Sequence, residues 1–293
     1  MEMHQVRYFL AVAEHLNFTR AAEACHVAQP SLTRAIKNLE EEMGGPLFRR
    51  ERNRTHLTEL GQITLPHMRH IAGASLAALT EAAQYESKAL APLSLGVMCT
   101  IGPARMVDFV QRLRREIPAL ELSIAEDSGG NLLTRMLDGE LDLALVAMPN
   151  YPERLQPRAL FDERYVIAFS PGHRFEQFNA VPTREIDGEP YLQRANCEFP
   201  NYINELHGGA RFRGRQVYRS EREDWIQAMV AAGMGVSIMP EQLPTQSGIV
   251  TRLLIEPEVR RTVSLVTVAG RRFSPTVARF IELAASHDWT PAS

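Results

Sequence analysis

A predicted helix at residues 28–40 places hydrogen-bond donors and cations along one of its faces. Its apolar positions recur at i, i+3, i+4 and i+7, which is the spacing of a single helix face, and they are Leu32, Ala35, Ile36 and Leu39. The opposite face carries Ser31, Thr33, Arg34, Lys37 and Asn38. Such a face is either solvated surface or a surface that reads base edges in the major groove of DNA, and this helix alone leaves both interpretations open.

A second group of cations follows the helix at residues 49–54. Four arginines surround a single acidic residue, Glu51, and they are Arg49, Arg50, Arg52 and Arg54. A local cluster of this kind binds phosphate even though the whole chain has a formal net charge of -3. The alternative is an ordinary cluster of surface arginines. A polar helix face followed by a basic hairpin favours binding to DNA.

The elements around these residues predict a small helical domain. Residues 1–44 give three short helices: Asn17 is a typical N-cap residue, Pro30 suits a first helical turn, and Gly44 is a typical C-terminal stop. The basic segment after the third helix reads as a hairpin, so we predict a winged helix-turn-helix.

Residues 58–88 predict a long helix with apolar or small residues in steps of three and four. These residues are Leu65, Met68, Ala72, Ser75, Leu79 and Ala82. The helix is either packed on its own domain or used for dimerisation, and its position between two domains favours dimerisation. Pro66 removes an intrahelical donor, so we expect it to kink or divide this helix.

Strands and helices alternate beyond residue 90. The segments at 93–99, 120–127 and 141–147 read as strands, with helices at 102–118 and 131–139 between them. This βαβαβ order predicts a parallel sheet covered by helices. A second block has strands near 163–170, 236–240 and 262–270 and helices at 223–235 and 274–287. We therefore expect an α/β fold with two lobes and a hinged cleft, as in periplasmic binding proteins.

Composition excludes several classes of protein. No apolar run approaches the roughly 20 residues of a membrane span, and the N-terminus lacks the pattern of a secretory signal. The three cysteines form no CxxC pair, so neither a disulfide framework nor a zinc site is expected, and a cytoplasmic protein fits best. His67 and His70 have the spacing of a metal pair on a helix, but a solvated face is the expected reading. We expect no metal and no cofactor.

Residues 18–50, FTRAAEACHVAQPSLTRAIKNLEEEMGGPLFRR, with HLTELG at 56–61, resemble the N-terminal signature of LysR-type transcriptional regulators. LDGELDLALVA, VAAGMGVSIMP and GRRFSPTVARFIELA are similar to landmarks of that family's effector domain. The resemblance implies a winged helix-turn-helix at 1–58, a linker helix at 59–88 and an effector-binding domain at 89–293. Its lobe I would comprise 89–161 and 267–293, and its lobe II 162–266. It also implies promoter DNA, a small-molecule effector and RNA polymerase as partners, and a homo-oligomer that is commonly a tetramer.

The DNA-binding residues follow from the geometry of a recognition helix and its wing. We expect Arg34 to reach guanine, Gln29 adenine and Thr33 a thymine methyl group. Pro30 stiffens the turn, while Lys37 and Asn38 reach the backbone. The full predicted set is Gln29, Pro30, Ser31, Thr33, Arg34, Lys37, Asn38, Arg50, Arg52, Arg54, His56 and Thr58.

The effector site is expected at the carboxyl ends of strands and the starts of helices, where backbone N–H groups favour anions. The predicted residues are Cys99, Thr100, Ile101, Gly102, Ser128, Gly129, Met148, Asn196, Cys197, Phe199 and Trp225, with Glu198 and Glu223 beside them. The alternative for each is an ordinary loop or helix cap. The expected effector is an organic anion whose binding changes the geometry of the bound DNA.

Two other functions stay open. Cys99 and Cys197 lie on opposite predicted walls, so an oxidant response through these thiols is an alternative, although peroxide-sensing relatives use a differently spaced pair and free cysteines mostly pack as small apolar residues. A solute-binding protein is the second alternative, but such a protein would not need the first ninety residues. An enzyme is not expected, because the chain has no GxSxG, Walker or dinucleotide motif.

Overall fold

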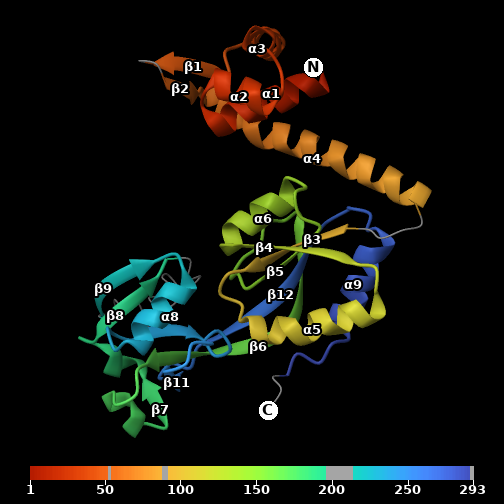
Figure 1. Ribbon diagram of the computed structural model, residues 1–293. Coiled ribbons are helices and arrows are strands. Elements are labelled where there is room, and N and C mark those ends of the chain that lie inside the picture. Colours follow the sequence, from red (N-terminus) through yellow and green to blue (C-terminus); the bar gives the residue numbers. More distant parts are fainter. Residues whose placement is uncertain (52–53, 88–91, 196–213, 291–293) are drawn as a thin grey trace. The chain divides into compact units, whose positions relative to one another are not determined.

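The computed structural model describes residues 1–51, 54–87, 92–195 and 214–290 (Figure 1). Its Cα positions fall into two compact units, one of residues 1–88 with 137–140 and one of residues 89–136 with 141–293. Among the described helices, none is both long enough and apolar enough to span a membrane.

The N-terminal unit is a winged helix-turn-helix, as the sequence predicts. Its elements are α1 (Met3–His15), α2 (Phe18–Ala24), α3 (Gln29–Met43), β1 (Phe48–Glu51) and β2 (Arg54–Leu57). The Asn17 side chain accepts hydrogen bonds from the N–H groups of Thr19 (2.9 Å) and Arg20 (3.1 Å), which starts α2. Gly44 ends α3 with a φ of 77°, a left-handed conformation that glycine adopts without strain.

The apolar face of α3 anchors it to this unit. Leu32, Ala35, Ile36 and Leu39 are all buried, which confirms the face predicted from their spacing. They share one core with Phe9 and Val12 of α1 and with Leu47. The polar face of α3 must therefore point away from the core.

The linker helix α4 (Glu59–Ser87) is continuous. Pro66 does not divide it, because the helix runs on through the proline, so that part of the prediction is wrong; a kink at Pro66 stays a prediction. Met68 is buried against the N-terminal core, whereas Leu76 and Leu79 are exposed. Use of this helix for dimerisation stays a prediction.

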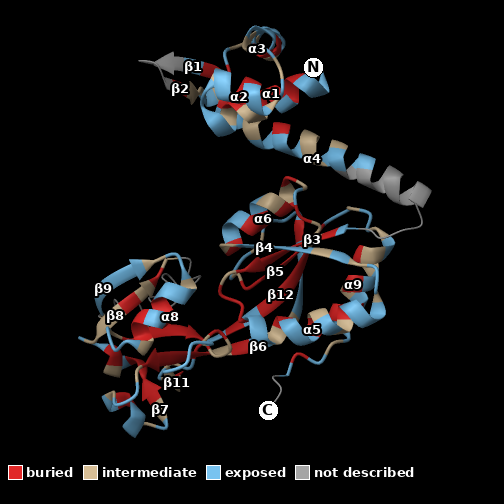
Figure 2. Cartoon of the chain, in the orientation of Figure 1, coloured by how far each residue is buried: buried red, intermediate tan, exposed pale blue. Residues whose placement is uncertain are grey.

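The second unit begins with the predicted βαβαβ block. The strands β3 (Pro92–Met98), β4 (Glu121–Asp127) and β5 (Leu143–Val146) are parallel, in the order β4-β3-β5. The helices α5 (Pro103–Glu116) and α6 (Gly129–Leu137) connect them, and α9 (Pro275–Ala285) packs beside α5 through the edge-to-face pair Phe109–Phe280. The strands β3 and β5 are largely buried, whereas β4, at the edge of this sheet, is largely exposed (Figure 2).

Two long antiparallel strands join this lobe to the second one. They are β6 (Leu155–Phe169) and β12 (Arg260–Val268), and β12 pairs with β5 while β6 continues to pair with β10 (Ser237–Pro240) and β11 (Val250–Ile255). In β6, Tyr165, Ile167 and Phe169 enter one core and Val166 and Ala168 enter another, as expected for a strand buried on both faces.

The rest of the second lobe surrounds these strands. Its further strands are β7 (Ala180–Pro182), β8 (Pro190–Arg194) and β9 (Arg215–Ser220), with the short helices η1 (Arg174–Gln177) and η2 (Thr183–Ile186) and the helix α8 (Glu223–Ala231). β8 and β9 form a parallel pair beside α8. The sequence predicted α8 and β10 but missed β7, β8, β9 and β11.

Candidate functional site

The exposed face of α3 presents the predicted recognition residues. Pro30, Ser31 and Arg34 are exposed on this face, together with Lys37 and Asn38 further along the helix. The Gln29 amide donates to the Thr33 hydroxyl at 3.1 Å, and this bond fixes both side chains at the start of the helix. The N-terminal half of α3 therefore offers a guanidinium and several neutral donors side by side, which is what readout of base edges in a major groove requires.

Short-range contacts fix the start of α3. His26 has a φ of 56°, and the N–H of Val27 donates to the carbonyl of Ala22 at 3.0 Å. Pro30 lies in the first turn of α3, where its missing N–H removes no helical hydrogen bond. Backbone contacts therefore fix the turn between α2 and α3, and with it the orientation of α3 relative to α2.

The wing is an antiparallel hairpin whose start is bonded to the Glu40 side chain of α3. Glu40 Oε1 accepts from the N–H groups of Leu47 (2.8 Å) and Phe48 (3.1 Å), so the start of β1 is fixed to α3. Arg50 lies in β1 opposite Thr55, and Arg54 begins β2. The predicted DNA contact Arg52 lies outside the described residues.

Two further predicted contacts lie in and after β2. His56 is half-buried and pairs with Arg49 across the hairpin. The Thr58 hydroxyl donates to the carbonyl of Pro46 at 2.6 Å and accepts from the N–H of Gly61 at 3.0 Å. Thr58 thus acts within the domain, where it fixes the start of α4; contact of its side chain with DNA stays a prediction.

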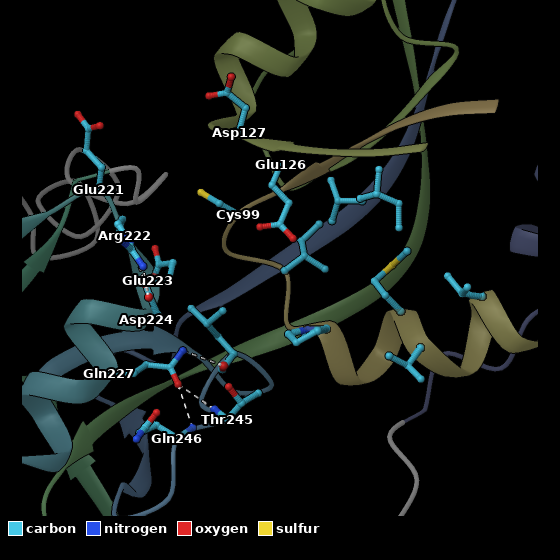
Figure 3. A pocket seen from close by; sticks show the side chains of 18 of the residues that line it. Cys99, Glu126, Asp127, Glu221, Arg222, Glu223, Asp224, Gln227, Thr245 and Gln246 are labelled. Carbon is cyan, nitrogen blue, oxygen red and sulfur yellow. Dashed lines mark hydrogen bonds and ion pairs between the residues drawn. The ribbon is translucent and has the colours of Figure 1, made fainter. Parts of the chain in front are cut away.

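A pocket of about 850 Å³ lies between the two lobes of the second unit (Figure 3). On the first lobe it is bounded by the ends of β3 and β4 and by one side of α5. On the second lobe it is bounded by residues 221–224, α8 and the segment 243–246. A pocket between lobes is the usual place for a small ligand in proteins with two α/β halves.

The first-lobe wall is mostly apolar. Its side chains come from β3, β4, α5 and the turn that precedes α5, and they include Val97, Ile101, Met106, Val107, Val110 and Ile124. The Cys99 sulfur and the Glu126 carboxylate project from this wall into the pocket (Figure 3).

The second-lobe wall is polar and is held in place by Gln227 of α8. The Gln227 carbonyl oxygen accepts from the N–H groups of Thr245 (2.9 Å) and Gln246 (3.1 Å), and its amide donates to the carbonyl of Leu243 (Figure 3). Arg222 donates to Asp224, and this bond holds the pKa of the Asp224 carboxyl below its usual range. The wall therefore presents an ordered set of charges.

A buried ion pair connects β6 and β12, the strands shared by both lobes, to the edge of this pocket. Arg261 of β12 and Glu163 of β6 are cross-strand neighbours, with side chains 4% and 1% exposed and Nη2 2.8 Å from Oε2. Arg261 also donates to the hydroxyl and the carbonyl oxygen of Thr100, both at 2.7 Å. Glu163 accepts from the N–H of Gln242 at 3.0 Å. One guanidinium thus links the end of β3 to the strands shared by both lobes.

The predicted effector residues divide into several groups. Cys99 and Ile101 line the pocket. Thr100 is buried behind it on Arg261, and Gly102 packs so closely that an added Cβ would lie 2.0 Å from the Gln242 carbonyl oxygen. These two residues therefore hold the lobes together at this point of the fold.

The remaining predicted residues lie apart from this pocket. Ser128 and Gly129 form the start of α6, and Met148 lines a separate hollow of about 570 Å³ beside Tyr151 and Thr262. Trp225 is exposed, with its ring 5.9 Å from the Arg222 guanidinium carbon. Asn196, Cys197, Glu198 and Phe199 lie outside the described residues.

Sequence reasoning missed Glu126, Gln227 and the pair Glu163–Arg261. The signal for the pair was present, because each residue is a charge at the edge of an apolar strand pattern. Only the register of β6 against β12 shows that the two charges meet. Glu126 follows Ile124 at the two-residue spacing of one strand face, but which face looks into a pocket depends on the packing of α5.

Comparisons with known proteins agree with both domains. Residues 3–62 match the model of the bacterial regulatory helix-turn-helix protein, lysR family, and residues 89–289 match the LysR substrate binding domain. The hydrogen peroxide-inducible genes activator of Dickeya chrysanthemi is 30% identical, covering 98% of this chain and 94% of that protein.

Two solved structures show the same arrangement of elements. A full-length OxyR variant from Pseudomonas aeruginosa is 26% identical with a TM-score of 0.66, covering 97% of this chain and 96% of that one. Full-length CbnR complexed with its target DNA is 20% identical with a TM-score of 0.71, covering 97% and 99%.

A helix-turn-helix domain followed by a two-lobed α/β domain with a pocket defines a class of DNA-binding regulators with an effector-binding domain. Since the family models cover most of its length, the chain belongs to the LysR family of bacterial transcriptional regulators.

Proposed function

We propose that this protein binds promoter DNA through α3 and the β1–β2 wing and changes the geometry of that DNA when a small molecule enters the pocket between its lobes. The observation that carries the proposal is the division of α3 into two faces. Leu32, Ile36 and Leu39 are buried, while Ser31 and Arg34 are exposed at the N-terminal half that enters a groove. CbnR, which shares this fold, has been solved in complex with its target DNA, and this supports the same role for the domain here.

A DNase I footprint of the full chain on the DNA upstream of its own gene tests this proposal. We expect protection of two half-sites whose centres are separated by a whole number of helical turns, because a symmetric oligomer presents two copies of α3. Binding that is equally strong on unrelated DNA at physiological salt would contradict it, since phosphate contacts alone give no sequence preference.

The response to the effector is proposed to be a shift between arrangements of the two lobes. A ligand that contacts both walls of the pocket favours the arrangement of the lobes in which the walls are closer. The equilibrium between the two arrangements shifts only as far as the ligand binds one of them more tightly than the other. The footprint should then change in extent or hypersensitive bands at saturating ligand, with little change in bare affinity. An unchanged footprint would contradict this part of the proposal.

The same proposal includes the organisation of the chain and its partners. We assign DNA binding to residues 1–58, dimerisation to 59–88 and effector binding to 89–293, with lobe I at 89–161 and 267–293 and lobe II at 162–266. We further propose a homo-oligomer, dimer or tetramer, that works in the cytoplasm with RNA polymerase and has no enzymatic activity. Exposed Leu76 and Leu79 on α4 support the oligomer.

An oxidant response is the second candidate, and the function given for one relative favours it. The Dickeya chrysanthemi protein is described as a hydrogen peroxide-inducible genes activator. In this chain the Cys99 thiol lines the pocket, whereas Cys197 lies outside the described residues. Mass spectrometry after mild peroxide treatment tests this candidate. A Cys99–Cys197 disulfide would support it. Cys99→Ser and Cys197→Ser variants whose DNA binding responds to peroxide just as the wild type's does would exclude it.

A further inference from the structure

We propose that the pocket between α5 and α8 binds an organic cation with an apolar body, in place of the organic anion that the sequence suggests. The proposal rests on the proposed function, because it names the chemical class of the effector. It follows from three features: the apolar wall of the pocket, the sign of the charges that line it, and the carboxylates that already stand at the N-termini of α6 and α8.

The apolar wall gives the body of the ligand a place to bind. Ile101, Met106 and Val107 face the pocket from one side of α5 and the turn before it, and Val107 is 51% exposed. Covering this wall with an aromatic or branched alkyl group removes apolar surface from water, and this supplies the affinity of most small-ligand sites.

Among the described residues, the charges that line the pocket are mostly negative. The described residues that line the pocket include five carboxylates and two guanidinium groups. Arg222 donates to Asp224, and the buried Arg194 behind the wall donates to Glu223 at 3.2 Å. When these two pairs are set aside, the remaining charged lining residues are Glu126, Asp127, Glu221 and Arg114.

The N-termini of α6 and α8, beside this pocket, already hold carboxylates of the chain. Asp127 Oδ1 accepts from the N–H of Ser128 (2.7 Å) and the amide of Asn131 (2.8 Å) at the start of α6. Glu223 and Asp224 form the first turn of α8. A helix N-terminus favours an anion, and at α6 and α8 that place is taken, so an anionic ligand would meet like charges there.

Glu126 is the carboxylate that we assign to the cationic group. Its side chain leaves β4 and points into the pocket over the apolar wall, whereas Asp127 and Glu221 lie at the rim (Figure 3). An ammonium group beside Glu126 would leave its apolar substituent against Ile101 and Met106. The attraction is partly screened because Glu126 is exposed, so we expect a moderate effect of its charge.

Calorimetric titration of the full chain with matched probes tests the proposal. The pairs share an apolar body and differ in head group: 2-phenylethylamine against 3-phenylpropanoate, and hexylamine against heptanoate. We expect each amine to bind at least tenfold more tightly than its carboxylate at neutral pH and low salt. Equal affinity, or tighter binding of the carboxylates, would overturn the proposal.

Variants locate the binding. Glu126→Gln should weaken amine binding about fivefold or more, whereas Glu121→Gln, an exposed position at the other end of the same strand, should leave it unchanged. Val107→Lys adds a cation to the exposed part of the wall and should narrow or reverse the preference for amines. If neither Glu126→Gln nor Val107→Lys changes the affinity for the amines, the amines do not bind in this pocket.

DNA binding separates this proposal from the proposed function. If no amine binds a protein that still binds its upstream DNA specifically, the cationic effector is wrong and the DNA-binding function stands. If the amines bind and specific DNA binding is absent, the pocket assignment stands and the proposed function fails.

Discussion

The buried pair Arg261–Glu163 gives a prediction whose size follows from its contacts. Arg261 donates to Glu163 Oε2 from Nε (3.0 Å) and Nη2 (2.8 Å), and to Thr100 from both terminal nitrogens. Arg261→Met removes all four bonds and leaves a carboxylate that is 1% exposed without its guanidinium. Removing one partner of a buried ion pair costs about 3–5 kcal/mol.

The double variant Glu163→Met/Arg261→Met separates the charge from the packing. The double variant removes both charges. Its remaining loss in free energy of unfolding comes from polar groups that lose their partners, such as the Gln242 N–H and the Thr100 carbonyl. Each buried polar group left without a hydrogen bond costs about 1–3 kcal/mol. The double variant should therefore lose at least about 2 kcal/mol less than the sum of the two single variants. Replacement of both members of a buried pair by apolar residues is often close to neutral.

Urea unfolding followed by tryptophan fluorescence measures these losses. Both tryptophans of the chain, Trp225 and Trp289, lie in the second unit, so the signal reports on the effector domain. Arg260→Met is the control: its guanidinium is paired with Glu258 and exposed, so it should lose less than about 1 kcal/mol. Two results would show that the ion pair does not stabilise the domain in this way. One is a loss of less than about 1 kcal/mol in the free energy of unfolding of Arg261→Met, and the other is a loss in the double variant equal to the sum of the losses in the two single variants.

Three further predictions concern the lobes, the wing and acid stability. Gly102→Ala places a Cβ against a carbonyl oxygen and should cost about 1–3 kcal/mol, whereas Gly130→Ala meets nothing within 4 Å and should not destabilise the domain in the same urea assay. Glu40→Ala releases the start of the wing and should weaken specific DNA binding more than Glu41→Ala, which removes the same charge from the same helix, as measured by gel shift. Burial lowers the pKa of His287 below its usual value, so the free energy of unfolding that the neutral imidazole contributes is present above about pH 6.5 and is lost as the pH falls. Between about pH 7 and pH 5, the free energy of unfolding of His287→Phe should therefore fall by less than that of the wild type. An equal fall in both proteins would contradict this.

Periodicity in the sequence was enough to predict most helices and the buried strands. The parallel strands β3 and β5 and the helices α3, α5 and α9 follow directly from apolar spacing, because each has one or two buried faces. The effect of Pro66 could not be predicted in this way. Whether a helix ends at a proline depends on the packing on either side of it, and α4 has Met68 in the N-terminal core.

The pocket shows where prediction from strand ends stops. Cys99, Thr100 and Ile101 follow one another after β3, yet only Cys99 and Ile101 line the pocket, and Thr100 is turned into the interior by Arg261. That partner lies 161 residues further along the chain, in a strand whose register the sequence does not specify. Glu126 was missed for the same reason, since its role depends on α5 packing beside it.

The affinity of the Arg34→Ala variant for the upstream DNA shows whether α3 reads the bases. Arg115→Ala, which removes an exposed arginine from α5, is the matched control. A bidentate contact between arginine and guanine is worth about 1–3 kcal/mol. We predict by fluorescence anisotropy that Arg34→Ala loses about five- to 150-fold in specific affinity and less in affinity for unrelated DNA, while Arg115→Ala matches the wild type. Equal specific affinities of both variants and the wild type would show that Arg34 of α3 does not read the DNA.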